Sequence, residues 1–185
     1  MRITGGSSRG RLLLSVKGSE IRPTSSKVRE AVFNIIGNDL SGMKVLDLFA
    51  GTGIMGLEAL SRGASFCLFA DNSDRALKLI KKNIDKCGFA DSAFTVKNNL
   101  KEDLPFHGLL SRGNIDLVFI DPPYGKNLIP GVMEAISRKE IMSSGSIFVA
   151  ETKKEDELPE KSGNLKLIKT RLYGKTKISI YGREK

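Results

Sequence analysis

The chain has 185 residues, which suffices for one domain with a single substantial core, and 40% of them are hydrophobic. No apolar run approaches the roughly 18 residues that a membrane-spanning helix needs, and the first six residues lack the apolar segment of a signal peptide. We therefore expect a cytoplasmic protein of one domain, residues 1–185, with no membrane partner.

The net charge of +9 is unevenly distributed along the chain. Residues 1–40 carry seven Lys and Arg against three Asp and Glu, residues 41–160 carry 15 against 17, and residues 161–185 carry eight against one. Basic ends around a near-neutral middle are typical of a protein that binds a polyanion around a catalytic centre. A general contribution to solubility is the alternative interpretation.

The residues that most often bind metals are few. Cys67 and Cys87 lack metal-ligand spacing, which favours structural thiols, and His107 has no nearby partner in the sequence. We therefore expect no metal site.

The N-terminal 40 residues predict an extension that precedes the catalytic core at 41–185. Residues 1–6 and 10–16 indicate a short hairpin around a basic turn. Residues 22–26 have the chemistry of a helix N-terminus. The helix that follows carries an apolar stripe and ends at Gly37; the stripe consists of Val28, Ala31, Val32, Ile35 and Ile36.

From Lys44 onward, strands alternate with helices, which is typical of a doubly wound α/β sheet. The terminal segments Leu165–Tyr173 and Lys175–Tyr181 indicate an antiparallel hairpin around Gly174. We predict a seven-stranded, mostly parallel sheet and an exposed charged loop over 153–161. The parallel strands are expected at 44–49, 66–70, 93–97, 115–121 and 146–151, and the helices at about 54–62, 74–87 and 127–138.

A glycine-rich loop joins the first predicted strand to the next helix. Gly51, Gly53 and Gly56 match the dinucleotide fingerprint, and Asp71 has the spacing of a ribose-binding acid, so a nicotinamide-dependent oxidoreductase is one candidate. Asp47, just before the loop, disfavours a pyrophosphate and favours the cationic S-adenosylmethionine. We also expect no second domain that could shape a hydride-acceptor site, which disfavours the oxidoreductase.

Polar residues follow the next two strands at the same expected sheet edge. Asp71 can accept hydrogen bonds from the ribose hydroxyls of either cofactor, although an exposed turn Asp is the alternative. Asn98 and Asn99 follow the third strand, where an amide can bind the adenine edge or simply form a turn.

The sequence Asp121-Pro122-Pro123-Tyr124 ends an apolar run at 115–120. Neither proline can donate to a strand ladder, so the chain leaves the sheet at its carboxyl edge, where open α/β sheets bind ligands. A base stacked on Tyr124 can present an exocyclic amine to Asp121 and to the Pro122 carbonyl. This favours group transfer to an amino nitrogen of a nucleobase, with an ordinary strand-to-turn exit as the alternative. Neither cysteine is placed to attack a pyrimidine ring.

Several blocks of the sequence together resemble the RsmD-type methyltransferases, which modify guanine N2 in small-subunit ribosomal RNA. The resemblance covers nearly the whole chain and implies a Rossmann-like class I methyltransferase fold that uses S-adenosylmethionine. It rests on Met1-Arg2-Ile3-Thr4-Gly5-Gly6, Arg9-Gly10-Arg11, residues 22–34, 46–53 and 56–64, and Asp121-Pro122-Pro123-Tyr124. Two positions depart from the family pattern: Asp71 replaces a common Glu, and Asn98-Asn99 replaces a common Gly-Asp pair.

The resemblance implies ribosomal RNA or the small ribosomal subunit as partner, and we expect a monomer. The residues expected to act on the base are Asp121, Pro122, Pro123 and Tyr124. The residues expected to bind the cofactor are Asp47, Phe49, Gly51, Thr52, Gly53, Asp71, Asn72, Asn98 and Asn99. The residues expected to bind RNA are Arg2, Arg9, Arg11, Arg22, Lys27 and Arg29.

Three alternatives stay open at this point. Arg29 can instead pair with the helix face of Glu30 or with an acid of the core. An adenine-N6 methyltransferase shares Asp121-Pro122-Pro123-Tyr124, although DNA enzymes of that kind usually add a recognition domain. A non-catalytic RNA-binding protein on the same scaffold should have lost the cofactor loop, which is intact here.

Overall fold

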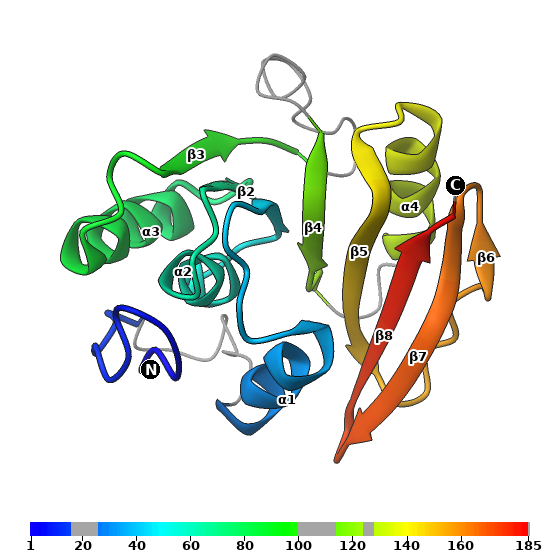
Figure 1. The fold of residues 1–185 in the computed structure, drawn as a ribbon, viewed down its shortest axis with the longest axis horizontal. Helices are drawn as coiled ribbons and strands as arrows, with labels where there is room; N and C mark the ends of the chain where they lie inside the picture. The colour runs from blue at the N-terminus through cyan, green and yellow to red at the C-terminus, as the bar shows by residue number, and fades with distance from the viewer. Residues whose placement is uncertain (16–25, 100–113, 124–127, 185) are drawn as a thin grey trace.

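A computed structural model describes residues 1–15, 26–99, 114–123 and 128–184 (Figure 1). No helix within these ranges is long and apolar enough to cross a membrane. The elements are α1 (Ser26–Ile36), β1 (Lys44–Leu48), α2 (Ile54–Ser61), β2 (Phe66–Asp71), α3 (Asp74–Cys87), β3 (Ala93–Lys97), β4 (Ile115–Ile120), α4 (Ile129–Arg138), β5 (Met142–Lys153), β6 (Lys161–Ser162), β7 (Leu165–Tyr173) and β8 (Thr176–Arg183).

The described strands form one sheet in the order β3-β2-β1-β4-β5-β8-β7-β6. The first five in this order are parallel, and β8, β7 and β6 are antiparallel to their neighbours, which confirms the predicted fold class. The sheet has eight strands rather than seven. The additional strand, β6, lies at the edge of the segment predicted as a charged loop, and two residues are too short to show an alternating pattern.

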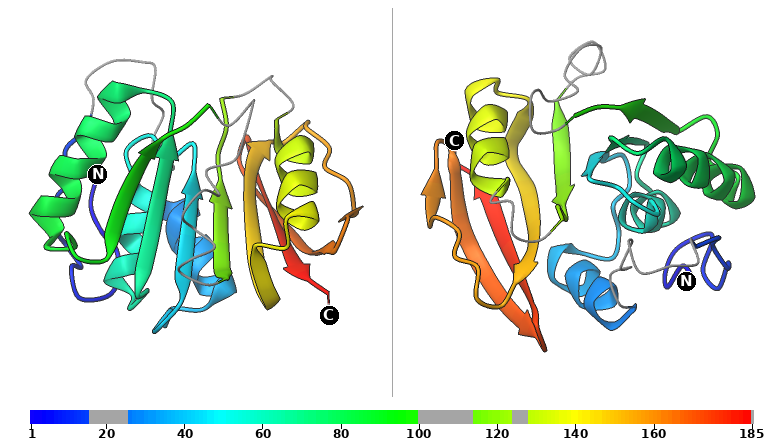
Figure 2. Two further views of the ribbon diagram at one scale, coloured as in Figure 1. Left: turned by 90° about the horizontal axis from the view of Figure 1, so that it is seen from above. Right: turned by 180° about the vertical axis from the view of Figure 1, so that it is seen from behind.

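Helices cover both faces of the sheet (Figure 2). One core contains side chains of α1, α2 and α3 together with Phe119 and Val149, and the other contains side chains of α4 with Leu48 and Phe148. The predicted helices are confirmed within two residues at each described end, because their end signals are local. Ser73, for example, caps α3 by accepting from the Ala76 amide, and Gly88 ends it in the left-handed region.

The N-terminal segment folds back on itself as expected, but a single bridge between Arg2 and Leu12 replaces the predicted pair of strands. The backbone amides of Thr4 and Gly5 do not continue the ladder, because both donate to the carboxylate of Glu58 on α2, at 2.9 and 2.7 Å. Ile3 and Leu13 are buried in the core beside them.

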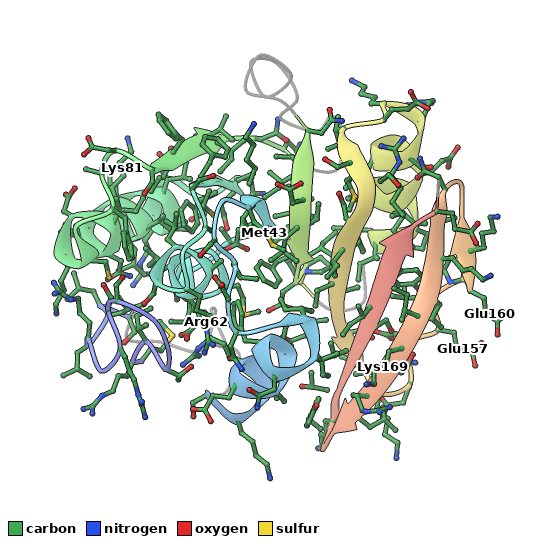
Figure 3. The ribbon with its side chains drawn as sticks, viewed as in Figure 1. Met43, Arg62, Lys81, Glu157, Glu160 and Lys169 are labelled. Carbon is green, nitrogen blue, oxygen red and sulfur yellow. The ribbon has the colours of Figure 1, made fainter. Side chains whose placement is uncertain are left out.

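Glu58 is fully buried and joins three parts of the chain. Besides Thr4 and Gly5, its carboxylate accepts from Arg29 Nε of α1 at 3.2 Å and from Arg62 at 2.9 Å. The Arg62 guanidinium also lies 4.6 Å from the centre of the Phe33 ring, so it contacts α1 as well (Figure 3). Glu58 therefore holds the N-terminal segment and α1 against α2.

Replacing Glu58 by Gln should lower the free energy of unfolding strongly, by about 3–5 kcal/mol, because two buried guanidinium groups would lose their countercharge. Chemical denaturation measures this loss. Glu184→Gln is the matched control, since Glu184 also serves two cations, Lys161 and Lys166, but at an exposed site. Little change is expected there, and equal losses in the two variants would contradict the role assigned to Glu58.

Candidate active site

The carboxyl edge of the parallel strands gathers most of the residues that the sequence singled out. In the sheet register Leu48 pairs with Ala70 and with Ile120, so the segments that follow β1, β2 and β4 leave the sheet side by side. Asn98 follows β3 next to them, and its backbone amide donates to the Asp71 carbonyl at 3.1 Å. Tyr124 and Arg22 lie outside the described residues.

The loop after β1 is held in an unusual backbone conformation. Phe49, Gly51 and Gly53 have φ values of 57°, 55° and 74°, in the left-handed region that favours glycine. The Gly51 amide donates to Asp71 Oδ2 at 2.8 Å, and the Gly53 amide donates to the Ala50 carbonyl at 2.7 Å. The loop is therefore preorganised and fastened to the end of β2.

Packing also constrains Gly53 and, more strongly, Gly56. A Cβ on Gly53 would lie 3.2 Å from the Ile80 side chain of α3. A Cβ on Gly56 would lie 2.4 Å from the Phe69 ring and 2.5 Å from Cys67 Sγ. Close approach of α2 to the sheet thus accounts for Gly56, whether the ligand is a dinucleotide or S-adenosylmethionine.

Asp71 is buried at the end of β2, and each of its carboxylate oxygens accepts one backbone hydrogen bond. Oδ2 accepts from Gly51, and Oδ1 accepts from the Ser73 amide at 2.9 Å. A carboxylate oxygen can accept a second hydrogen bond. Asp71 can therefore support the loop and receive ribose hydroxyls at the same time.

Asn98 carries a buried amide oxygen, Oδ1, that has no hydrogen-bond partner among the described residues. A buried acceptor without a donor is costly, and such atoms often mark a ligand position. Oδ1 fits a ligand that brings an amine, as the adenine of S-adenosylmethionine does. The candidate site thus combines an unpaired buried acceptor, a carboxylate that can accept further hydrogen bonds and a preorganised loop, a set that fits an adenine amine, ribose hydroxyls and the remainder of S-adenosylmethionine.

The other residues expected near the cofactor differ in their exposure. Asn72 and Asn99 are exposed at the ends of β2 and β3. Thr52 is buried, and its hydroxyl lies 3.7 Å from the sulfur of Met1. Any contact from Thr52 to a cofactor would therefore come from its backbone.

Three carboxylates share one face of the sheet at this edge. Asp47 pairs with Phe119, which pairs with Val149, and residues two apart in a strand point to the same face. Asp121 lies two residues after Phe119, and Glu151 lies two residues after Val149. Both therefore belong to the same face of the sheet as Asp47. Sequence reasoning missed Glu151, although it ends an apolar run, Ile147–Ala150, much as Asp121 ends its own.

Burial and mutual repulsion shift the pKa values of this cluster. Burial raises the pKa of Asp47 to about 8, against the opposing effect of a 3.0 Å hydrogen bond from the Gly56 amide. The pKa of Asp121 also lies well above its usual value, because of burial first and then the nearby carboxylates of Glu151 and Asp47. A cationic ligand would relieve this repulsion.

The residues expected to bind RNA divide into two groups. Arg2, Arg9, Arg11 and Lys27 are exposed, and the Arg11 guanidinium donates to the Lys86 carbonyl. The expectation for Arg29 is wrong, because its side chain is 2% exposed and paired with Glu58. The helical periodicity could have predicted this burial. Position 29 is next to Val28 and one turn before Phe33, and both of these residues lie on the side of α1 that faces the core.

Comparison with known proteins gives the family. The model of a family described as "Conserved hypothetical protein 95" matches residues 1–182. The chain belongs to this family. "Putative rRNA methyltransferase YlbH" of Bacillus subtilis is 36% identical over 98% of both chains. "Ribosomal RNA small subunit methyltransferase D" of Escherichia coli is 29% identical over 100% of this chain and 90% of that one.

The solved structures agree with these relatives. "Putative methyltransferase yhhF from Escherichia coli" matches this chain with a TM-score of 0.83 and 28% sequence identity. The match covers 100% of this chain and 98% of that chain. The resemblance to RsmD-type proteins is thus confirmed, and so is the class I methyltransferase fold. The chain is a methyltransferase, and S-adenosylmethionine is the methyl donor of this fold class.

The raised pKa of Asp47 predicts how stability depends on pH. Between about pH 4, the usual pKa of an unfolded Asp, and pH 8 the folded protein retains a proton that the unfolded chain releases, so stability should fall as pH rises through this window. Asp47→Asn keeps an acceptor for Gly56 and should flatten this fall. Urea denaturation of the protein without cofactor, from pH 4.5 to 8, measures the difference, and Asp85→Asn on the surface of α3 is the control. Parallel curves for wild type and Asp47→Asn would contradict the assignment.

Proposed function

We propose that the protein transfers a methyl group from S-adenosylmethionine to the exocyclic N2 amine of a guanine in small-subunit ribosomal RNA. The observation that carries the proposal is the pairing of β1 with β4, which sets Asp121 and Pro122 beside the glycine loop. An acceptor for amine hydrogens thus adjoins the expected methyl donor. Membership of a family that includes small-subunit ribosomal RNA methyltransferases supports the choice of RNA.

The cofactor would be held along the carboxyl edge of the sheet. Asn98 Oδ1 would accept from the adenine amine, Asp71 would accept from the ribose hydroxyls, and the loop from Phe49 to Gly53 would enclose the methionine portion. Asp47 lies beneath that loop, where a bound cationic ligand would favour the ionised form of its carboxyl. When bound, S-adenosylmethionine supplies an electrophilic methyl group on a sulfonium.

Asp121 and the Pro122 carbonyl would accept the two amine hydrogens of the target base. This hydrogen bonding withdraws the nitrogen lone pair from conjugation with the ring and directs it toward the methyl group. No covalent nucleophile is needed, and neither cysteine suits that role. Both are buried, and burial raises the pKa of each thiol, that of Cys67 most strongly.

The exposed Arg2, Arg9, Arg11 and Lys27 would contact RNA phosphates, and Tyr124 would stack on the base. The acting species would be a single-domain monomer in the cytoplasm. The target would be either naked RNA or the assembled small subunit.

Removing the Asp121 carboxylate should abolish most methyl transfer. Asp121→Ala should lower kcat by about 10²–10⁴-fold, the usual range for a group that handles a proton in the transition state, while the affinity for S-adenosylmethionine is retained. The assay follows labelled methyl groups into small-subunit RNA and small subunits, and mass spectrometry identifies the nucleoside. The expected product is N2-methylguanosine. N6-methyladenosine would overturn the guanine assignment, and full turnover by Asp121→Ala would move the site elsewhere.

Removing the acceptor of Asn98 should weaken cofactor binding. Asn98→Leu should raise the Kd for S-adenosylmethionine about fivefold, as expected for one lost hydrogen bond of roughly 1 kcal/mol, and Asn98→Asp should restore it. Calorimetry gives both values. Asn98 is a sharper probe than Asp71, because Asp71 also supports the loop through Gly51. An unchanged Kd in Asn98→Leu would place the adenine contact at another residue.

A further inference from the structure

The tip of the terminal hairpin, residues 169–177 of β7 and β8, is a basic surface that the proposed site does not use. Lys153, the last residue of β5, pairs with Thr176, so the turn at Gly174 and Lys175 extends beyond the carboxyl end of β5. Figure 1 shows this hairpin projecting past the ends of the neighbouring strands. The tip therefore overhangs the sheet edge at which Asp121 lies.

Among the described residues, the cations of the hairpin form ion pairs at one end, which we call the balanced end. Residues 165–183 contain six Lys and Arg and no Asp or Glu. At the end far from the site, Lys161 and Lys166 pair with Glu184 at 2.8 and 3.3 Å, and Arg183 lies 4.0 Å from Glu140. The tip also carries four cations that form no ion pair within the described ranges: Lys169, Arg171, Lys175 and Lys177.

The strand register shows how far these cations lie from Asp121, where the proposed reaction takes place. Ile120 pairs with Ala150, which pairs with Ser179, so Asp121 is level with Ile178, and Lys177 and Lys175 lie further out. From β4 to β8 is two strand spacings, or about 10 Å. A polynucleotide whose target base enters the site can bring neighbouring phosphates within this range.

Exposed apolar side chains on β7 raise the question of a protein partner. Ile168 is 66% and Leu172 is 52% exposed. A second copy of this chain would bring two positive tips together, which is unfavourable without intervening anions. A polyanion satisfies the charges directly, and the sugar and base surfaces of RNA can cover the apolar atoms.

We propose that the hairpin tip binds phosphates of the RNA strand that flanks the target nucleotide. This inference rests on the proposed function, since it takes RNA as the substrate. The N-terminal segment and the hairpin lie at opposite ends of the long axis, as Figures 1 and 2 show. Figure 3 places Lys169 on the hairpin and, in a different part of the molecule, Arg62, which pairs with Glu58. RNA is thereby held on both sides of the base that enters the site.

The test compares two variants that lose the same charge from the antiparallel part of the sheet, β6 to β8. Arg171→Ala with Lys175→Ala removes two exposed cations from the tip, and Lys161→Ala with Lys166→Ala removes two from the balanced end. RNA affinity is measured at several salt concentrations with the methyl acceptor found by the nucleoside assay, together with kcat, KM and the affinity for S-adenosylmethionine. A charge-preserving variant, Arg171→Lys with Lys175→Arg, controls for changes in packing.

The tip variant should bind RNA several-fold more weakly, with a salt slope reduced by about 1.5, or about 0.7–0.9 for each lost phosphate contact. Its KM for RNA should rise while the affinity for S-adenosylmethionine is unchanged, and the charge-preserving variant should resemble wild type.

Equal losses in the tip and balanced-end variants would indicate a general effect of net charge and overturn the proposal. Unchanged binding to naked RNA with weaker binding to assembled subunits would indicate a protein partner instead. If the wild type methylates no RNA, the proposed function itself fails, whereas an active wild type with an unaffected tip variant refutes only this inference.

Discussion

The buried carboxylate of Glu58 is the interaction on which the arrangement of this protein most depends. It collects donors from the N-terminal segment, from α1 and from the end of α2, so three parts of the chain share one countercharge. Without it, Arg29 and Arg62 would lose the carboxylate that neutralises both of them, and removing the countercharge of a buried cation is among the most costly defects in a folded protein. The first turn of the same helix, through Gly56, also binds Asp47 beneath the glycine loop. One helix thus sets the N-terminal segment in a defined position relative to the cofactor loop.

Electrostatics divides the molecule into an acidic centre and basic ends. Asp47, Asp121 and Glu151 gather where a cationic methyl donor and a neutral base would meet, and their repulsion is relieved when positive charge enters. Phosphates are repelled from the same place. The cations lie instead on the N-terminal segment and on the terminal hairpin, where a backbone can be held while only a base reaches the acids. This division favours a base turned out of its helix, because an intact duplex would bring phosphates toward the acidic centre.

Local patterns were sufficient for most of the fold and for part of the site. The five parallel strands, their helices and the terminal hairpin followed from periodicity, caps and turn residues, which act over a few positions. The strand ends also predicted that the glycine loop, Asp71 and Asp121 lie together, because parallel strands end at one edge. The two-residue strand β6 and the single bridge of the N-terminal segment were missed, since each depends on a distant partner: β7 for the first and Glu58 for the second.

The sequence by itself determined the fold class, the edge at which the site lies and the chemical type of most of its residues. Only the tertiary structure decided which polar groups are paired and which are not. Arg29 has the residue type of a phosphate ligand but is buried beside an acid 29 residues away. Glu151 joins Asp121 only through the pairing of β4 with β5, and Asn98 is distinguished from Asn99 only by the burial of one oxygen atom. Burial and pairing arise from contacts between segments far apart in the chain, and a local pattern carries no information about which distant group will arrive.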